Sequence, residues 1–148
     1  MINLLLVCIV LSTPAVSQHT REFAKKNNVS GKWHYVTSAH WHKGSCPPPR
    51  KGKGLISIKR KGSKVTLQVL SGLKCSPKGI CTCPGTIKGK KIHCSKTMKV
   101  DNEGGKANNT FHLIQKTETL IKGTVKSWYK HPSGFKCTWG FKVTLKKK

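Results

Sequence analysis

The stretch that decides the fold lies near the C-terminus and runs Phe135-Lys136-Cys137-Thr138-Trp139-Gly140-Phe141-Lys142-Val143-Thr144-Leu145-Lys146. Its odd positions are apolar, and its even positions are lysine, threonine or glycine. A period of two over this length predicts a half-buried β-strand. Shorter runs with the same period occupy residues 65–69 and 121–125. Each of these strands is therefore expected to have one core face and one lysine or threonine face.

Short polar turns separate the alternating runs, at residues 61–63, 88–90, 116–118 and 131–134. Such spacing predicts hairpins. No stretch shows the period of 3.6 that an amphipathic helix needs. Residues 43–54 and 71–86, which are rich in glycine, proline and cysteine, are expected to be loops. We expect an all-β fold, an antiparallel meander of about seven to nine strands that closes into a small barrel or a flattened sandwich.

The N-terminus has the pattern of a secretory leader. Residues 1–17 carry no charge, run apolar from Ile2 to Leu11, and end in Ala15-Val16-Ser17, a small-x-small cleavage pattern. We therefore expect a signal peptide at residues 1–17 and a secreted, extracellular protein. The apolar run is too short to span a bilayer, and no later run is longer. Residues 18–30 are expected to form a flexible N-terminal arm, and residues 31–148 a single disulfide-stabilised β domain.

Cysteines are the expected source of stability. Apart from Cys8 in the leader, the chain has six: Cys46, Cys75, Cys81, Cys83, Cys94 and Cys137. An even number in an exported chain predicts three disulfides, which offset a small core and the repulsion between like charges. Sequence alone does not choose the pairing. Cys81 and Cys83 are expected to have different partners, because their side chains point to opposite faces of an extended backbone.

The charge balance points to an anionic partner. The chain has 29 Lys or Arg against 4 Asp or Glu, a formal charge of +25. Solubility alone requires far less charge. Two basic runs fall at predicted hairpin tips, and further lysines lie on the outward faces of the last two strands. The expected polyanion-binding residues are Lys59, Arg60, Lys61, Lys64, Lys88, Lys90, Lys91, Lys122, Lys126, Lys136, Lys142 and Lys146.

The kind of polyanion follows from the kind of cation. Only three of the basic residues are arginine, and lysine lacks the bidentate fork that reads guanine. Sequence-specific nucleic-acid recognition is therefore not expected. Glycosaminoglycans, anionic cell or microbial surfaces and acidic matrix fit an extracellular protein, and an anionic membrane surface is the closest competitor. We expect a monomer that binds such polyanions, including heparin, through its lysine-rich hairpins.

The sequence offers little for catalysis. The acidic residues Glu22, Asp101, Glu103 and Glu118 are scattered, so neither a carboxylate pair nor a serine triad is expected. A histidine-lysine-histidine site of the kind found in secreted ribonucleases is chemically possible with His34, His93 and His112, but the flanking sequence of that family is missing. We expect no enzyme and no cofactor.

Metal binding and glycosylation each have one candidate pattern. His40 and His42 are weak metal-ligand candidates, because side chains at i and i+2 of a strand share a face. They do not reach the four ligands of a structural zinc site. Asn28 and Asn108 begin N-glycosylation sequons, which we expect to flank strands rather than to interrupt them.

The first predicted strand, Ser30-Gly31-Lys32-Trp33-His34-Tyr35, resembles the opening strand of lipocalins and their calycin relatives, which include avidins. The resemblance implies an up-and-down barrel in which Trp33 crosses the closed end against a basic residue from a late strand. Lys142 or Lys146 would supply that residue. It also implies an alternative function, the carriage of a small apolar ligand in the barrel. A barrel filled by Trp139 and Phe141 would argue against that function.

Overall fold

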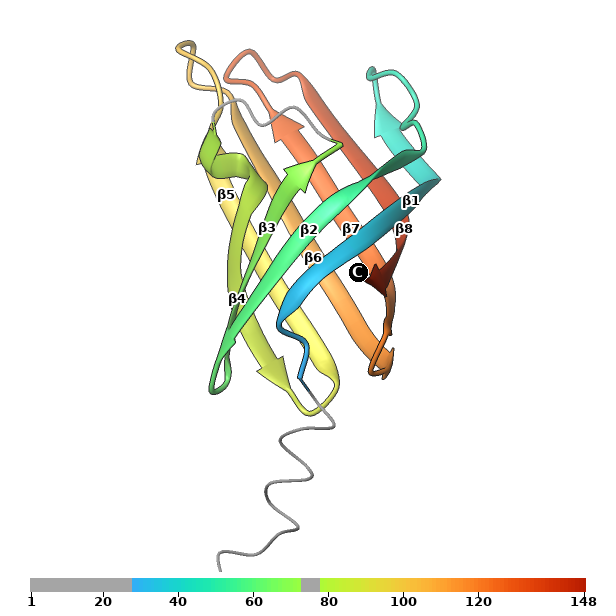
Figure 1. Ribbon diagram of the computed structural model, residues 1–148. Coiled ribbons are helices and arrows are strands. Elements are labelled where there is room, and N and C mark those ends of the chain that lie inside the picture. The colour runs from blue at the N-terminus through green and yellow to red at the C-terminus, as the bar shows by residue number, and fades with distance from the viewer. Residues whose placement is uncertain (1–27, 73–77) are drawn as a thin grey trace, which may run out of the picture.

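The chain forms a closed, eight-stranded antiparallel β-barrel. The computed structural model describes residues 28–72 and 78–148. Its strands are β1 (Gly31–Gly44), β2 (Gly52–Lys61), β3 (Lys64–Ser71), β4 (Thr82–Lys88), β5 (Lys91–Lys99), β6 (Lys106–Thr117), β7 (Leu120–Lys130) and β8 (Lys136–Lys147). Each strand pairs with the next, and β8 pairs with β1 (Figure 1). The predicted all-β meander is confirmed, and its form is the barrel rather than the sandwich.

The two expected loops are shorter than predicted. β1 continues to Gly44 and β2 begins at Gly52, so the first loop spans residues 45–51. In the second, a short 3-10 helix, η1 (Lys78–Cys81), leads directly into β4. Gly85 lies within β4, where a Cβ atom would collide with the His93 carbonyl and with Cys94. Its glycine therefore reflects a close approach between strands, not a loop.

The two ends of the barrel differ (Figure 1). The β2–β3, β4–β5 and β6–β7 turns lie at one end, near the start of β1. Gly62 and Gly89 have φ values of 60° and 55°, a conformation that glycine adopts without strain. The β1–β2, β5–β6 and β7–β8 loops lie at the opposite end. We call these the turn end and the loop end.

Trp33 seals the turn end. Its ring is fully buried, and its Nε1 donates a 2.9 Å hydrogen bond to the carbonyl of Val29, which is itself fully buried. The Lys147 ammonium lies 5.2 Å from the Trp33 ring centroid and donates to the Asn28 carbonyl. The predicted basic partner is thus Lys147, not Lys142 or Lys146, because alternate residues of β8 face outward and both of those lysines are exposed.

The boundary of the domain also lies earlier than expected. The Val29 carbonyl accepts a hydrogen bond from Trp33, the Asn28 carbonyl accepts one from Lys147, and the Ser30 hydroxyl accepts one from the Arg60 amide. Residues 28–30 therefore belong to the barrel and not to an arm. The expected signal peptide and the rest of the expected arm lie outside the described residues.

Two disulfides fasten the barrel. Cys46 bonds to Cys137 and Cys83 to Cys94, with Cα–Cα distances of 5.8 and 5.9 Å. Cys81 is not a free thiol. Since Cys83 bonds to Cys94, Cys81 and Cys83 are not joined to each other, as predicted. The third predicted disulfide involves Cys75, which lies outside the described residues, so that part stays a prediction.

Candidate ligand cavity and basic surfaces

The loop-end half of the barrel contains a partly open cavity of about 690 Å³. Its walls come from the inward faces of the strands, and the lining residues toward the turn end include Ile56, Leu113 and Leu145. The β1–β2 loop lines it at the opposite side, at the loop end. Apolar cavities of this size hold small organic ligands in other proteins. The barrel therefore has room for a guest molecule in addition to its core.

Trp139 and Phe141 line this cavity instead of filling it. Trp139 is held aside because its Nε1 donates a 3.1 Å hydrogen bond to the Pro47 carbonyl of the β1–β2 loop. Phe141 packs against the buried core but remains partly exposed to the cavity. The observation that would have argued against a carrier is thus absent from the described part of the barrel.

The polar groups of the cavity wall already have partners. The Ser127 hydroxyl donates a 2.6 Å hydrogen bond to Asn109 Oδ1, and the Tyr35 hydroxyl donates to the Ser71 carbonyl. Burial raises the pKa of Tyr35, so it stays protonated. The Thr37 hydroxyl accepts from the Gly52 amide. The wall therefore presents mostly satisfied or apolar groups to a guest.

The mouth of the cavity is cationic. Arg50 and Lys51 follow Pro49 in the β1–β2 loop and line the cavity, and both are exposed. Within the described chain, no carboxylate pairs with either side chain. The Cys46–Cys137 disulfide anchors this loop to β8. Sequence reasoning missed both residues, although their place after a proline tract in a disulfide-closed loop was a usable signal.

The structure brings together the two basic hairpin tips. The β2–β3 and β4–β5 turns are neighbours at the turn end, because β3 pairs with β4 and the Ile87 amide donates to the Ser63 carbonyl. The predicted residues on these turns are all exposed: Lys59, Arg60, Lys61, Lys64, Lys88, Lys90 and Lys91. We call them the turn-end cluster. The Arg60 side chain already makes one hydrogen bond within its turn, because its Nε donates to the Gly62 carbonyl.

The remaining predicted lysines form a second group on the outer faces of β7 and β8. Lys122, Lys126, Lys136, Lys142 and Lys146 are all exposed. In the register, Lys122 pairs with Thr144 and Lys142 with Thr124, so these lysines do not face one another. Pairing with threonine lowers the repulsion between these two lysines. Lys136, in contrast, lies directly opposite Lys130.

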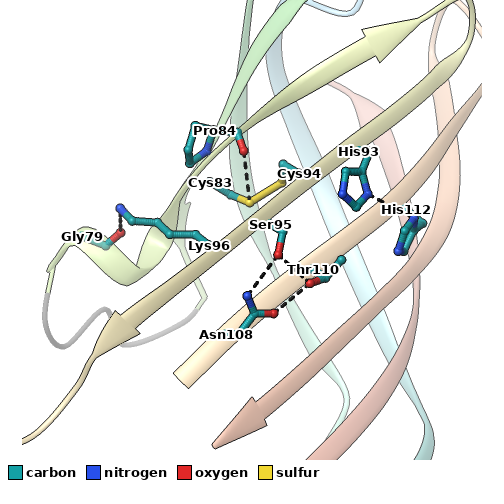
Figure 2. The surroundings of a disulfide bond; sticks show 10 residues. All are labelled: Gly79, Cys83, Pro84, His93, Cys94, Ser95, Lys96, Asn108, Thr110 and His112. Atoms are coloured by element: carbon teal, nitrogen blue, oxygen red, sulfur yellow. Dashed lines mark hydrogen bonds between the residues drawn. A yellow bond between two sulfur atoms is a disulfide. The ribbon is translucent and has the colours of Figure 1, made fainter. Parts of the chain in front are cut away.

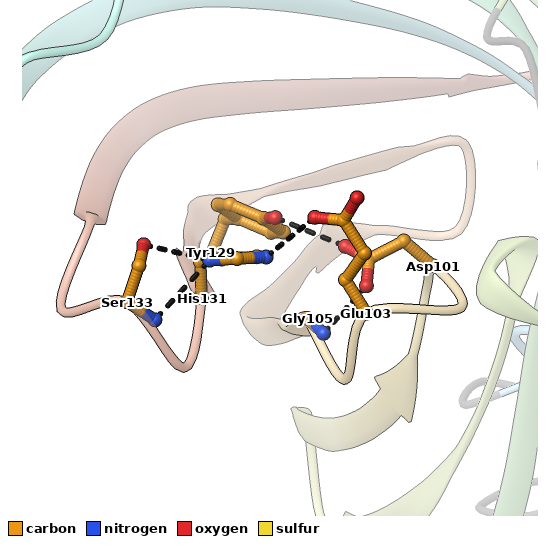
Figure 3. A network of polar contacts seen from close by, with 6 residues as sticks. All are labelled: Asp101, Glu103, Gly105, Tyr129, His131 and Ser133. Atoms are coloured by element: carbon orange, nitrogen blue, oxygen red, sulfur yellow. Dashed lines mark hydrogen bonds and ion pairs between the residues drawn. The ribbon is translucent and has the colours of Figure 1, made fainter.

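Two of the acidic residues are engaged at the loop end (Figure 3). The Gly105 amide donates a 2.6 Å hydrogen bond to Asp101, and the Tyr129 hydroxyl donates a second one. The first of these bonds is the main reason that the pKa of Asp101 is lowered. His131 Nε2 lies 3.0 Å from a carboxylate oxygen of Glu103, within hydrogen-bond distance. These contacts join the β5–β6 loop to the end of β7.

The metal candidates His40 and His42 are both exposed on β1 and lie at an irregular part of that strand. A β-bulge between Ala39 and Trp41 interrupts the regular alternation on which the prediction depended. The nearby Cys46 is bonded to Cys137. In residues 28–72 and 78–148, no group of three or more His, Cys, Asp and Glu side chains is placed to hold a metal ion.

The two sequons differ in placement. Asn28 is exposed before β1, whereas Asn108 lies inside β6, only 7% exposed. The Asn108 Nδ2 donates to the hydroxyl of Ser95 (Figure 2) and to that of Thr97. The expectation that this sequon flanks a strand is therefore wrong, and a glycan on Asn108 would replace one Nδ2 hydrogen and break at least one of these bonds.

No family model matches the chain, and neither the curated proteins nor the solved structures include a significant match. Among the described residues, no helix is long and apolar enough to cross a bilayer.

Proposed function

We propose that this protein is a non-enzymatic carrier of a small amphipathic anion, with the apolar body of the ligand in the barrel and its anionic head at the mouth. The observation that carries the proposal is the cavity of about 690 Å³ inside a closed eight-stranded barrel. Barrels of this strand number are just wide enough to hold one small ligand. The calycin resemblance of the Gly31–Trp33 segment supports the same proposal, as does the Lys147 ammonium that lies 5.2 Å from the Trp33 ring centroid at the turn end.

The mouth sets the chemistry of the head group. Arg50 and Lys51 are cations without a carboxylate partner among the described residues, while Asn109, Ser127 and Tyr35 are hydrogen-bonded within the wall. An anionic head would gain charge-assisted hydrogen bonds at the mouth. A cationic head would be repelled by the same side chains and by the formal charge of +25.

The test is displacement of a fluorescent probe by three amphiphiles with the same alkyl chain and a carboxylate, alcohol or ammonium head. We expect the carboxylate to bind most tightly and the ammonium least. Arg50→Gln and Lys51→Gln should lower the advantage of the carboxylate over the alcohol, whereas Lys53→Gln, on the outer face of β2, should not. Equal binding of all three amphiphiles would contradict the assignment of the head group.

A separate pair of variants tests the cavity itself. Val69 lines it, whereas Val36 is 56% exposed on the outer face of β1. Val69→Phe should reduce the affinity for every amphiphile because it occupies ligand volume, and Val36→Phe should have no effect. Unchanged binding in Val69→Phe would place the ligand outside the barrel.

We also propose that the turn-end cluster binds extracellular polyanions, because seven exposed cations from two neighbouring turns gather there. The cluster lies at the opposite end from the cavity mouth, so the two functions do not compete. In this proposal the protein is secreted, and the surface charge keeps a loaded carrier on glycosaminoglycan or another anionic surface.

Heparin chromatography tests this second function. Replacing Lys59, Arg60, Lys61 and Lys64 by Gln should lower the salt concentration of elution and make the affinity less salt-dependent, since fewer counterions are released. The matched control is replacement of Lys122, Lys126, Lys136 and Lys142, which removes equal charge elsewhere. If both quadruple variants elute together, net charge and not the turn-end cluster determines binding.

A further inference from the structure

Two histidines lie side by side on the outer face of the barrel (Figure 2). His93 of β5 is the direct cross-strand partner of His112 of β6, and both are exposed. Their Nδ1 atoms are 3.2 Å apart, with ring centroids 4.6 Å apart and planes inclined by 40°. The strand register thus brings two imidazole nitrogens together at the surface.

We propose that His93 and His112 jointly bind one divalent transition-metal ion of the zinc or copper type. Zinc–nitrogen bonds of about 2.0–2.1 Å at a tetrahedral angle separate two ligand nitrogens by about 3.3–3.4 Å. A right angle at copper separates them by about 2.8–2.9 Å. The observed 3.2 Å lies between these values. An ion can therefore be held with small ring rotations and no movement of the backbone.

Binding requires one change of tautomer. In the metal-free pair, one Nδ1 carries a hydrogen and donates it to the other nitrogen, because two bare lone pairs would repel at this distance. For both nitrogens to coordinate, that hydrogen moves to Nε2 of the same ring. The ring stays neutral, and solvent fills the remaining positions of the ion. The site is therefore open, unlike a structural zinc site.

The backbone beneath the pair is held firmly. Cys94, next to His93, is bonded to Cys83 on β4 (Figure 2). The hydroxyls of Ser95 and Thr110 share a 2.9 Å hydrogen bond across β5 and β6, and Asn108 donates to Ser95. These contacts fix the strand register that places the two imidazole rings opposite each other. Ligands fixed before the ion arrives lose little conformational freedom on binding.

The surroundings of the pair select the ion. Its cross-strand neighbours are Thr86 on β4 and Thr124 on β7, and neither supplies a carboxylate. Magnesium and calcium prefer anionic oxygen ligands, whereas zinc and copper bind imidazole.

Lys91 and Lys126 lie on the same outer face, and the chain carries a formal charge of +25. This positive field opposes a cation, so added salt should strengthen metal binding by screening it. Polyanion binding should respond to salt in the opposite direction.

The experiment is a zinc titration of the chelator-treated full chain, followed by ¹⁵N NMR of the histidine side chains. We expect the Nδ1 resonances of His93 and His112 to shift together with one binding constant, and affinity to rise with salt. His93→Gln and His112→Gln should each weaken binding by about tenfold or more, or about 1.4 kcal/mol. His34→Gln, which removes an exposed histidine from β1, is the matched control and should bind as the wild type does.

Three results would overturn the proposal. The first is a zinc response confined to other histidines, such as His40 and His42. The second is an equal loss of affinity in His34→Gln and His93→Gln. The third is binding that weakens as salt is added, because an ion held on this lysine-rich face must gain from screening. The first and third results are measured on the wild-type protein, from its histidine resonances, so they can be obtained even if a variant misfolds.

Discussion

The two disulfides seen in the barrel should differ in their contribution to stability. Cys46 and Cys137 are 91 residues apart in the sequence, and Cys83 and Cys94 only 11 apart. A cross-link that closes a longer loop removes more entropy from the unfolded chain. The chain-entropy relation gives about 4.6 kcal/mol for the first and about 2.8 kcal/mol for the second, a difference of about 1.8 kcal/mol.

The assay is urea unfolding at equilibrium of two paired alanine variants, Cys46→Ala/Cys137→Ala and Cys83→Ala/Cys94→Ala. Cys83 and Cys94 are both buried, whereas in the other pair only Cys137 is, so the second variant loses more packing and this works against the expected difference. We expect the first variant to lose more free energy of unfolding. An equal loss, or a larger one for Cys83–Cys94, would refute the loop-entropy reasoning for this barrel.

The same comparison has a functional side. The Cys46–Cys137 bond holds the β1–β2 loop, which carries Arg50 and Lys51, against β8. Its removal should therefore reduce the preference for a carboxylate over an alcohol at temperatures where the barrel is still folded. Removal of Cys83–Cys94, which joins β4 to β5, should leave that preference unchanged.

Three further changes test particular contacts. Gln115→Leu should raise the free energy of unfolding by about 1 kcal/mol in thermal or urea unfolding, because the Gln115 amide is buried and has no hydrogen-bond partner among the described residues; a loss of stability would show that the amide is satisfied. Asp101→Asn should flatten the acid limb of a curve of stability against pH. The pKa of Asp101 is lowered, so its carboxylate stabilises the fold above the ordinary pKa and loses that effect as the pH falls through the lowered value. An unchanged acid limb would contradict the role of its bond to Gly105. Gly140→Ala should displace the Trp41 ring, which lies where the new Cβ would be, and a fluorescence spectrum identical to that of the wild type would show that the ring is elsewhere.

The strands were predictable because their signal is local. The alternation over Phe135–Lys146 depends only on which residues face the core, and β8 (Lys136–Lys147) follows it closely. Closure of β8 onto β1 was not predictable in the same way, since a period of two is identical in a barrel and a sandwich. β4 was missed because Pro84 and Gly85 imply a loop, whereas pairing with β3 and β5 imposes an extended chain.

The candidate sites depended on information that no single segment contains. Trp139 and Phe141 have the same inward pattern whether they fill a barrel or line a cavity. The approach of His93 to His112 depends on the register of β5 and β6, which the loop between them sets. The exposed lysines were predictable from charge alone, but the meeting of two turns in one cluster required the order of strands around the barrel.

The most direct test of the carrier proposal is a crystal structure of the protein with a long-chain carboxylate that bears bromine at its far end. Anomalous scattering locates the bromine without reference to the shape of the density. The proposal predicts bromine deep in the barrel beside Ile56 and Leu145, with the carboxylate at Arg50 and Lys51. Bromine at the mouth, or a ligand bound only to the outer face, would contradict it.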